Sequence, residues 1–173
     1  MARPAGGANT DSTTDWRALA RQALAVRTQQ LLSRSDEWAR PDLRAAFLRR
    51  IAGGHDPLGD QYSAAVSPEE RRRIGATFTP ASIVEAMLLW AKCRSADFAM
   101  PRRIVDPGAG TGRFSLLAAK IFPQSQVIAV ESDKEIAGLL RANIQAAKLV
   151  DRVTVIESDF RSVILDRCDG PTL

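Results

Sequence analysis

Histidine and cysteine are scarce in this sequence of 173 residues. His55 is the only histidine, and Cys93 and Cys168 stand far apart without forming a Cys-x-x-Cys pair. These absences argue against a zinc site and against a catalytic triad that depends on histidine, so we predict no metal. The low cysteine content favours a reducing, cytoplasmic setting.

Long apolar runs are also missing. No stretch reaches the length of about 18 residues that a membrane helix needs, and the start Met-Ala-Arg-Pro lacks the apolar core of a signal peptide. We therefore expect no membrane partner. The net charge is +4, and only four of the 24 basic residues are lysines. Arginine makes forked contacts to phosphates, so nucleic acid is a permissible partner.

The most informative segment runs from Ile104 to Phe114, with the sequence Ile-Val-Asp-Pro-Gly-Ala-Gly-Thr-Gly-Arg-Phe. A short apolar strand leads into a turn with glycine at every second position, and a helix follows. Glycine has no Cβ, so this backbone can take positive φ and approach a ligand closely. The dinucleotide fingerprint needs a glycine where Arg113 stands, and the Asp106 carboxylate would repel a pyrophosphate. The pattern therefore favours a positively charged, phosphate-free ligand such as S-adenosylmethionine.

The first part of the chain is predicted to be helical. Residues 1–12 are small and polar and predict a disordered lead. Apolar positions at helical spacing predict a helix over residues 15–33 and a second one from Pro41 until the glycines at 53 and 54. Residues 55–66, with Gly, Pro, Asp and Ser, are interpreted as a connector. We therefore divide the chain into the lead, a helical extension with its connector over 13–66, and a second domain over 67–173.

In that second domain the sequence pattern alternates between strands and helices. Runs rich in β-branched residues at 103–105, 126–130 and 152–156 alternate with helical patterns at 112–122 and 133–147. This order predicts an α/β fold with three parallel strands, right-handed crossovers and flanking helices. Near-continuous apolar strands predict that both faces of the sheet are covered. One face of the second helix gathers Ile136, Leu139, Leu140, Asn143 and Ala147.

Acidic residues stand where the first two strands end. Asp106 reaches the carboxyl edge of the sheet, where it would hold the ammonium group of the ligand or orient the glycine turn. Glu131 follows the second strand, near the spacing at which an acidic residue accepts both ribose hydroxyls. Ser132 and Glu135 fit a capping box for the next helix, which leaves Glu131 for the ligand.

The third strand ends at Asp159 and Phe160. The aspartate could accept a hydrogen bond from an adenine amino group while the phenyl ring packs on the base. A helix cap beside a core aromatic is the alternative interpretation. Further upstream, Gly75-Ala-Thr-Phe-Thr-Pro80 precedes an apolar helix over 81–91, with Thr79 as the predicted N-cap and Pro80 at the first helical position.

These motifs, taken in order, resemble the opening of a gamma-class amino-methyltransferase over about residues 70–160. Members of that family methylate the exocyclic amino group of adenine in DNA, often in restriction–modification or phage-defence systems. The resemblance implies a partial Rossmann-like methyltransferase fold, S-adenosylmethionine as cofactor and DNA as partner of the intact protein. It implies that the cofactor is held by Thr77, Phe78, Thr79, Asp106, Pro107, Gly108, Ala109, Gly110, Gly112, Phe114, Glu131, Ser132, Asp159 and Phe160.

One family motif does not occur in these 173 residues. The Asn/Asp-Pro-Pro-aromatic motif that follows strand four in the family, and that binds the target base, is absent. We therefore assign no catalytic residue, interpret the chain as truncated before that motif, and expect it to be inactive alone. Residues 168–173 would lead toward strand four. Strand one would become an exposed apolar edge, so we expect poor stability, self-association or pairing with a partner chain.

Three alternatives stay open. The substrate could be RNA or a protein glutamine, because related enzymes share the glycine loop, although the Thr-Pro element favours DNA. The chain could instead be a non-catalytic module that binds a cofactor or a partner through its N-terminal helices. A nucleotide-dependent dehydrogenase is the third and least favoured alternative.

Overall fold

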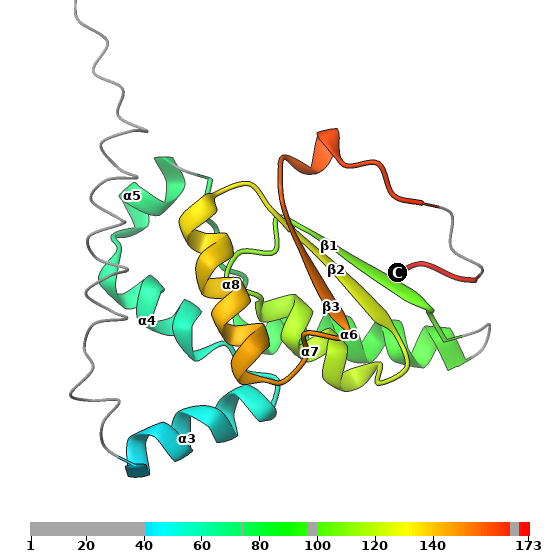
Figure 1. Cartoon of the computed structure of the whole chain (residues 1–173), viewed down its shortest axis with the longest axis horizontal. Coiled ribbons are helices and arrows are strands. Elements are labelled where there is room, and N and C mark those ends of the chain that lie inside the picture. The colour runs from blue at the N-terminus through cyan, green and yellow to red at the C-terminus, as the bar shows by residue number, and fades with distance from the viewer. Residues whose placement is uncertain (1–40, 74, 97–99, 167–169) are drawn as a thin grey trace, which may run out of the picture.

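The computed structural model describes residues 41–73, 75–96, 100–166 and 170–173 (Figure 1). The predicted lead and the predicted helix over 15–33 lie outside the described residues. Within the described part, helices precede a small sheet and alternate with its strands. No helix in that part combines the length and apolarity needed to cross a bilayer.

The sheet contains three parallel strands in the order β1-β2-β3. They are β1 (Arg103–Pro107), β2 (Gln126–Glu131) and β3 (Val153–Glu157). Each lies within two residues of its predicted position, because short β-branched runs bounded by polar turns mark strands clearly. The predicted α/β fold with three parallel strands is confirmed.

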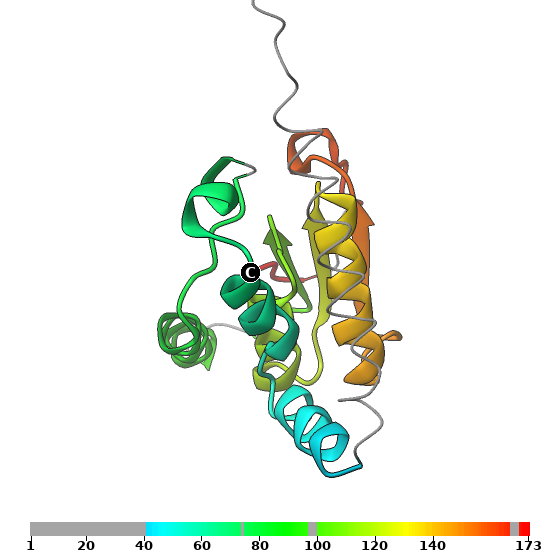
Figure 2. The same ribbon diagram turned by 90° about the vertical axis from the view of Figure 1, so that its left-hand side faces the viewer.

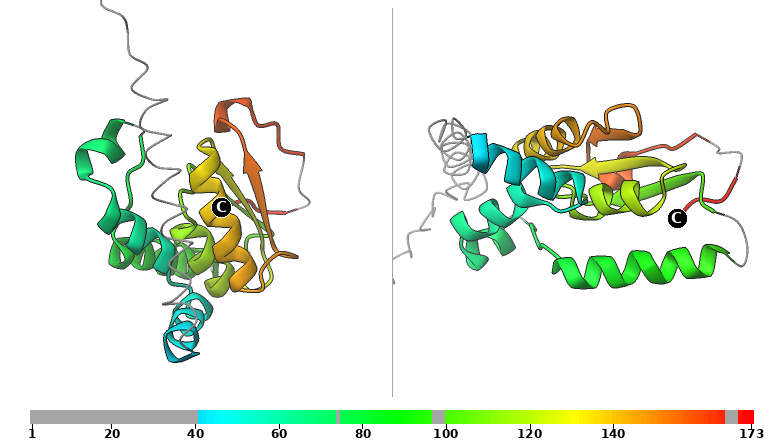
Figure 3. Two further views of the ribbon diagram at one scale, coloured as in Figure 1. Left: turned by 60° about the vertical axis from the view of Figure 1, so that its left-hand side comes forward. Right: turned by 90° about the horizontal axis from the view of Figure 1, so that it is seen from below.

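Three helices lie on one side of the sheet (Figure 3). Helices α7 (Arg113–Ile121) and α8 (Lys134–Ala146) form the two crossovers, and α6 (Ala81–Ala96) packs beside α7. Right-handed crossovers that progress in one direction place their helices on the same face. The expectation that both faces are covered is wrong for the described helices, and accordingly Val153 is buried while Thr154 beside it is exposed. The core between sheet and helices includes Val84, Leu88, Ile104, Ala118, Phe122, Val127, Leu140 and Ile144.

The extension forms α3 (Pro41–Ala52) and α4 (Pro57–Ala65), and α5 (Pro68–Arg73) follows at the start of the second predicted domain. The predicted connector over 55–66 is therefore wrong, because most of it is helix α4. Asp56 caps this helix by accepting a hydrogen bond from the Gly59 N–H group (2.8 Å). Pro57 occupies the first helical position, where a missing N–H group costs nothing. The Asp-Pro pair is thus a helix start, although the same residue types are common in loops.

The extension packs on the last helix of the sheet domain (Figure 2). Leu58 and Tyr62, four residues apart on α4, form a buried cluster with Ile136 and Leu139 of α8. Residues four apart share one face of a helix, so this pair presents a single apolar surface. The described part of the extension therefore belongs to the same packed body as the sheet.

The free side of β1 is paired near its start. Thr172 forms a parallel bridge with Arg103, the Leu173 N–H group donates to Arg103 O (2.9 Å), and Val105 N–H donates to Leu173 O (2.8 Å). The expectation that the first strand has an exposed edge is therefore wrong for residues 103–105 of β1. Residues 171–173 satisfy backbone groups that an edge strand would leave open.

Candidate functional site

The three strand ends meet at one edge of the sheet (Figure 1). The N–H groups of Gly108 and Ala109 donate to Val130 O at 2.8 and 2.9 Å. The Ser158 N–H group donates to Glu131 O at 3.0 Å. The glycine turn, the end of β2 and the turn after β3 are therefore hydrogen-bonded neighbours, as the sequence predicts.

The glycine turn needs glycine for different reasons at its two ends. Gly108 has φ +74°, and a Cβ there would meet no atom within 4 Å, so its backbone faces open space. Gly112 has φ +103°, and a Cβ there would lie 2.5 Å from Leu140 Cδ1. The first glycine permits the approach of a ligand, and the third permits the close packing of α7 against α8.

Glu131 is the most buried acidic residue at this edge, with 8% of its surface exposed. Its Oε2 atom accepts the Gly110 N–H group and its Oε1 atom accepts the Asp133 N–H group, both at 2.8 Å. A carboxylate oxygen has more than one lone pair, so each oxygen can accept a further hydrogen bond from a ligand hydroxyl. Glu131 therefore fixes the glycine turn and stays available to a ligand.

The predicted capping box at Ser132 is wrong. Helix α8 is capped by Asp133, whose Oδ1 atom accepts the N–H groups of Glu135 (2.9 Å) and Ile136 (3.2 Å). Ser132 lies exposed in the turn before it. The helix begins one residue later than a Ser132 cap requires, and aspartate caps as well as serine does.

Asp106 ties the end of β1 to the first turn of α7. Its Oδ2 atom accepts the Ser115 hydroxyl at 2.6 Å. Burial raises the pKa of Asp106, hydrogen bonds from Ser115 lower it, and the charge of Glu131 raises it further. Of the two predicted roles, this contact favours orientation of the glycine turn. Pro107, the next residue, is exposed.

Asp159 and Phe160 lie at the same edge but at the surface. Asp159 caps the short helix η1 (Phe160–Ser162), and its Oδ2 atom is 2.6 Å from Arg161 Nη2. Hydrogen bonds from Arg161 lower the pKa of Asp159 to about 2. The carboxylate therefore performs the alternative role, that of a cap. The Phe160 ring is 42% exposed, which leaves it open to pack on a ligand.

The segment before α6 lies against the glycine turn. Phe78 packs on Tyr62 with ring centroids 5.5 Å apart, and the Arg113 guanidinium lies 5.8 Å from the Phe78 centroid. Arg113 Nη1 also donates to Thr79 O at 2.9 Å. Thr77 is exposed. These contacts bring the Thr-Pro element beside the turn.

One predicted detail of this region changes. Helix α6 begins at Ala81, and its first acceptor is Pro80 O, which takes the Val84 N–H group at 3.1 Å. The start is thus one residue later than predicted, a difference at the usual precision of helix ends. Phe114 lines an apolar groove between α6 and β1, which also reaches Asp106 near the end of that strand. This groove, which we call the α6–β1 groove, is lined by Met87, Leu88, Trp90, Ile104, Val105, Asp106, Phe114 and Leu173.

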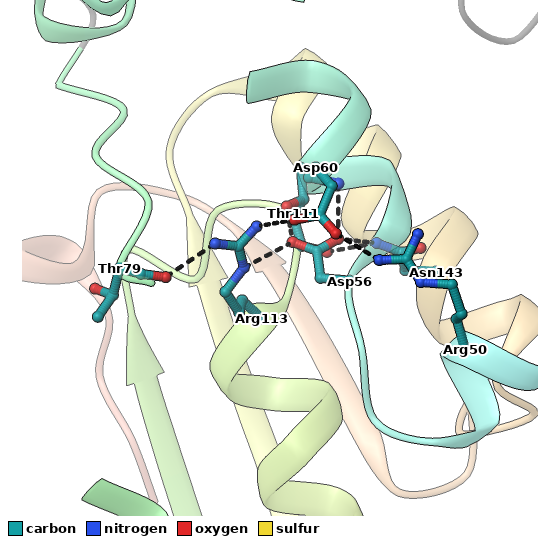
Figure 4. A network of polar contacts seen from close by, with 8 residues as sticks. Arg50, Asp56, Asp60, Thr79, Thr111, Arg113 and Asn143 are labelled. Atoms are coloured by element: carbon teal, nitrogen blue, oxygen red, sulfur yellow. Dashed lines mark hydrogen bonds and ion pairs between the residues drawn. The ribbon is translucent and has the colours of Figure 1, made fainter. Parts of the chain in front are cut away.

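Sequence reasoning missed a buried polar cluster behind the glycine turn (Figure 4). Asp56 accepts the Thr111 hydroxyl through Oδ2 and the Asn143 amide through Oδ1, the latter at 2.7 Å. Asn143 Nδ2 also donates to Thr111 O at 2.9 Å. Arg113 Nε lies 3.8 Å from Asp56 Oδ2, and Arg113 Nη2 donates to Asp60 Oδ1 at 2.7 Å.

Burial raises the pKa of Asp56, while Thr111, Gly59, Arg113 and Asn143 all lower it. One sequence signal could have indicated this cluster: Asn143 stands alone as a polar residue on the apolar face of its helix. A buried amide needs partners, so its position predicts a polar group opposite.

With this geometry established, comparison with known proteins identifies the class. The TRM5/TYW2 methyltransferase domain matches residues 76–170, more than half of the chain. The chain belongs to this methyltransferase family. The predicted enzyme class and the predicted cofactor, S-adenosylmethionine, are confirmed at the level of the family.

Individual relatives are also methyltransferases. The chain is 48% identical over 117 residues to the Type II methyltransferase M.XamI of Xanthomonas campestris pv. amaranthicola, covering 68% of this chain and 20% of that protein. A tRNA1(Val) (adenine(37)-N6)-methyltransferase of Porphyromonas gingivalis is 33% identical over 47% of the chain and 31% of the relative. A release factor glutamine methyltransferase of Rhodopirellula baltica is 30% identical over 57% and 33%.

These relatives agree with the resemblance found in the motifs. The chain spans about a fifth of the length of M.XamI and about a third of the other two. Among solved structures, the METTL16 MTase domain has a TM-score of 0.44 and 18% identity, covering 51% of this chain and 35% of that one.

Proposed function

We propose that this chain is the S-adenosylmethionine-binding part of a methyltransferase that acts on the N6 amino group of adenine in DNA, in a restriction–modification or phage-defence system. The observation that carries the proposal is the meeting of the glycine turn, Glu131 and the turn after β3 at one sheet edge. The similarity to a Type II methyltransferase favours DNA over other substrates.

The residues at this edge fit an adenosine with a charged sulfonium group. Gly108 leaves open space over the turn, and the buried Glu131 carboxylate lies against it through Gly110. A nucleotide phosphate would meet the carboxylates of Glu131 and Asp106 near the turn, and this charge disfavours it. The edge thus suits a cationic, phosphate-free cofactor.

When bound, S-adenosylmethionine supplies an electrophilic methyl group on a positively charged sulfur. We propose that Glu131 accepts the ribose hydroxyls, that the backbone of Gly108–Gly110 lies against the methionine part, and that the Phe160 ring packs on the adenine. Asp159 would have to release Arg161 before it could accept the adenine amino group. That pair is exposed, so exchanging it for a ligand contact costs little.

Two further substrate classes and one other function remain as alternatives. Relatives named for tRNA adenine and for release factor glutamine keep RNA and protein as candidate substrates. The α6–β1 groove, with Trp90 68% exposed, keeps open a role in which this chain chiefly binds a partner. The cytoplasmic setting stays a prediction.

Two assays test the proposal. Isothermal calorimetry should show S-adenosylhomocysteine binding to this chain, while NAD at the same concentration should give no heat. Preference for NAD would favour the dehydrogenase alternative and contradict the proposal. With radiolabelled S-adenosylmethionine, this chain, and a longer product if the gene encodes one, should be offered unmethylated DNA, tRNA and release factor. Label in N6-methyladenine of DNA supports the proposal, whereas label only in RNA or protein overturns its substrate.

A further inference from the structure

The buried cluster behind the glycine turn joins three parts of the chain that are remote in sequence. Asp56 caps the start of α4, Thr111 comes from the turn itself and Asn143 comes from the last turn of α8. All three are buried, with 3%, 0% and 0% of their surfaces exposed. Buried polar groups persist where they find partners, and each of these side chains makes at least one hydrogen bond within the cluster, although the Asn143 Oδ1 atom has no partner among the described residues.

Thr111 is held at its hydroxyl and at its backbone carbonyl. Its hydroxyl donates to Asp56, and its carbonyl accepts from Asn143 at 2.9 Å. The residues on either side are glycines with φ +59° and +103°, and glycine restricts the backbone dihedral angles less than any other residue does. Fixing Thr111 fixes the peptide planes on both of its sides, which join it to Gly110 and to Gly112. The peptide before Gly110 is held separately, because Glu131 accepts the Gly110 N–H group.

Gly59 of α4 lies directly against this cluster. A Cβ on Gly59 would collide with the Asp56 carboxylate and with the Thr111 hydroxyl. The absence of a side chain at residue 59 thus lets α4 approach the turn closely enough for the direct bond. Neither Asp56 nor Asn143 lies at the open side of the turn, where Gly108 faces empty space.

We propose that Asp56 and Asn143 are positioning residues that hold the glycine turn in its cofactor-binding shape, so that the helical extension sets cofactor affinity. This inference rests on the proposed cofactor site. It predicts that a change at residue 143 alters ligand binding through the shape of the turn and without any contact to the ligand.

The substitution Asn143→Asp tests this with pH as the variable. It places a second carboxyl group about 2.7 Å from Asp56 Oδ1, at the position of the Asn143 amide. Two carboxyl groups this close share one proton at acidic pH and repel each other once both ionise. The charged groups that face the pair are Arg113 from α7 and, bonded to Arg113, Asp60 from α4, which in turn pairs with Arg50 of α3.

Near pH 5 the shared proton restores the bond to Asp56, whereas the bond from residue 143 to Thr111 O stays lost, so the variant should bind S-adenosylhomocysteine within about tenfold of the unmodified chain. Near pH 8 the repulsion should weaken binding by about a further tenfold or more, each affinity being compared with that of the unmodified chain at the same pH. Gln145→Glu is the matched control, since it adds the same charge to an exposed position of the same helix. Its affinity ratio to the unmodified chain should not change with pH.

Hydrogen exchange of the amides over 110–113 gives a second readout that does not depend on the ligand. After correction for intrinsic rates, the ratio of the exchange rates in Asn143→Asp to those in the unmodified chain should be larger near pH 8 than near pH 5. Both measurements should be made at a temperature at which circular dichroism shows that the unmodified chain and Asn143→Asp are folded at both pH values. If the unmodified chain does not bind the ligand, the proposed function fails, and the exchange rates still decide the positioning role. An exchange-rate ratio that is the same at both pH values, or an affinity loss independent of pH, would overturn the positioning role.

Discussion

Replacing Glu131 by alanine should weaken cofactor binding far more than its effect on local structure alone would suggest. In the proposed complex the Glu131 carboxylate accepts the two ribose hydroxyls. A pair of charge-assisted hydrogen bonds of this kind contributes about 2 to 3 kcal/mol, so the affinity for S-adenosylhomocysteine should fall about thirty- to a hundredfold.

The same substitution also removes two internal bonds, because the Gly110 and Asp133 amides lose their acceptor. Bonds to a charged acceptor contribute about 1.5 to 3 kcal/mol each, and water can replace part of this at a partly open edge. We expect a loss of about 2 to 4 kcal/mol in the free energy of unfolding. Affinity must therefore be measured at a temperature where the variant is folded, as judged by circular dichroism.

Glu157→Ala is the matched control. Glu157 is the register partner of Glu131 on β3, has the same charge and pairs with Arg141 at 3.0 Å. It is exposed, and its removal should change the affinity by less than about threefold. Isothermal calorimetry that shows less than a threefold loss for Glu131→Ala, or an equal loss for both variants, would refute the assignment of Glu131 to the ribose.

Three further predictions follow from the same contacts. Gly59→Ala should lower the free energy of unfolding by about 1 to 3 kcal/mol, because a Cβ there collides with the buried carboxylate and the turn threonine; urea unfolding should show Gly138→Ala, on open surface, to be neutral or mildly stabilising. Since the folded pKa of Asp159 is lowered to about 2, its pairing with Arg161 stabilises the fold above about pH 3.8 and is lost as the pH falls toward 2. A carbon-detected NMR titration should give that midpoint, and Arg161→Ala should return it toward 3.8, so an unchanged midpoint would contradict the pairing. If the apolar groove drives self-association, Trp90→Glu should shift the chain toward monomer in analytical ultracentrifugation, and an unmodified chain that stays monomeric at tens of micromolar would argue against it.

The sheet and its ligand-facing edge could be predicted from the sequence because their signals are local. A β-branched run such as Gln126 to Val130 marks a strand, and parallel strands bring their ends to one edge regardless of the details of packing. The placement of the glycine turn beside Glu131 follows from this rule alone.

The sequence could not predict which of several similar groups makes a given contact. Ser132 and Asp133 are both good caps, and the turn geometry that selects Asp133 is set by Glu131 accepting its amide. Asp159 could accept from a base or from its neighbour Arg161, and proximity along the chain favours the neighbour. The presence of Pro57 and Gly59 predicted a loop, but this segment is helical because the apolar residues of α4 pack on α8.

The Asp56 cluster shows the limit most clearly, since its bonds join residues 55 and 87 positions apart. No window along the sequence contains both partners. Only the fold brings them together.

That separation has a consequence for how the chain acquires its active shape. Contacts between distant residues form slowly, because the chain must lose the entropy of closing a long loop before the contact stabilises it. The bond between Asp56 and Asn143 requires both α4 and α8 to be docked, so the glycine turn should become rigid among the last events of folding. A partly folded chain would then have strands and helices but little affinity for its cofactor, so the cofactor would bind only fully folded molecules.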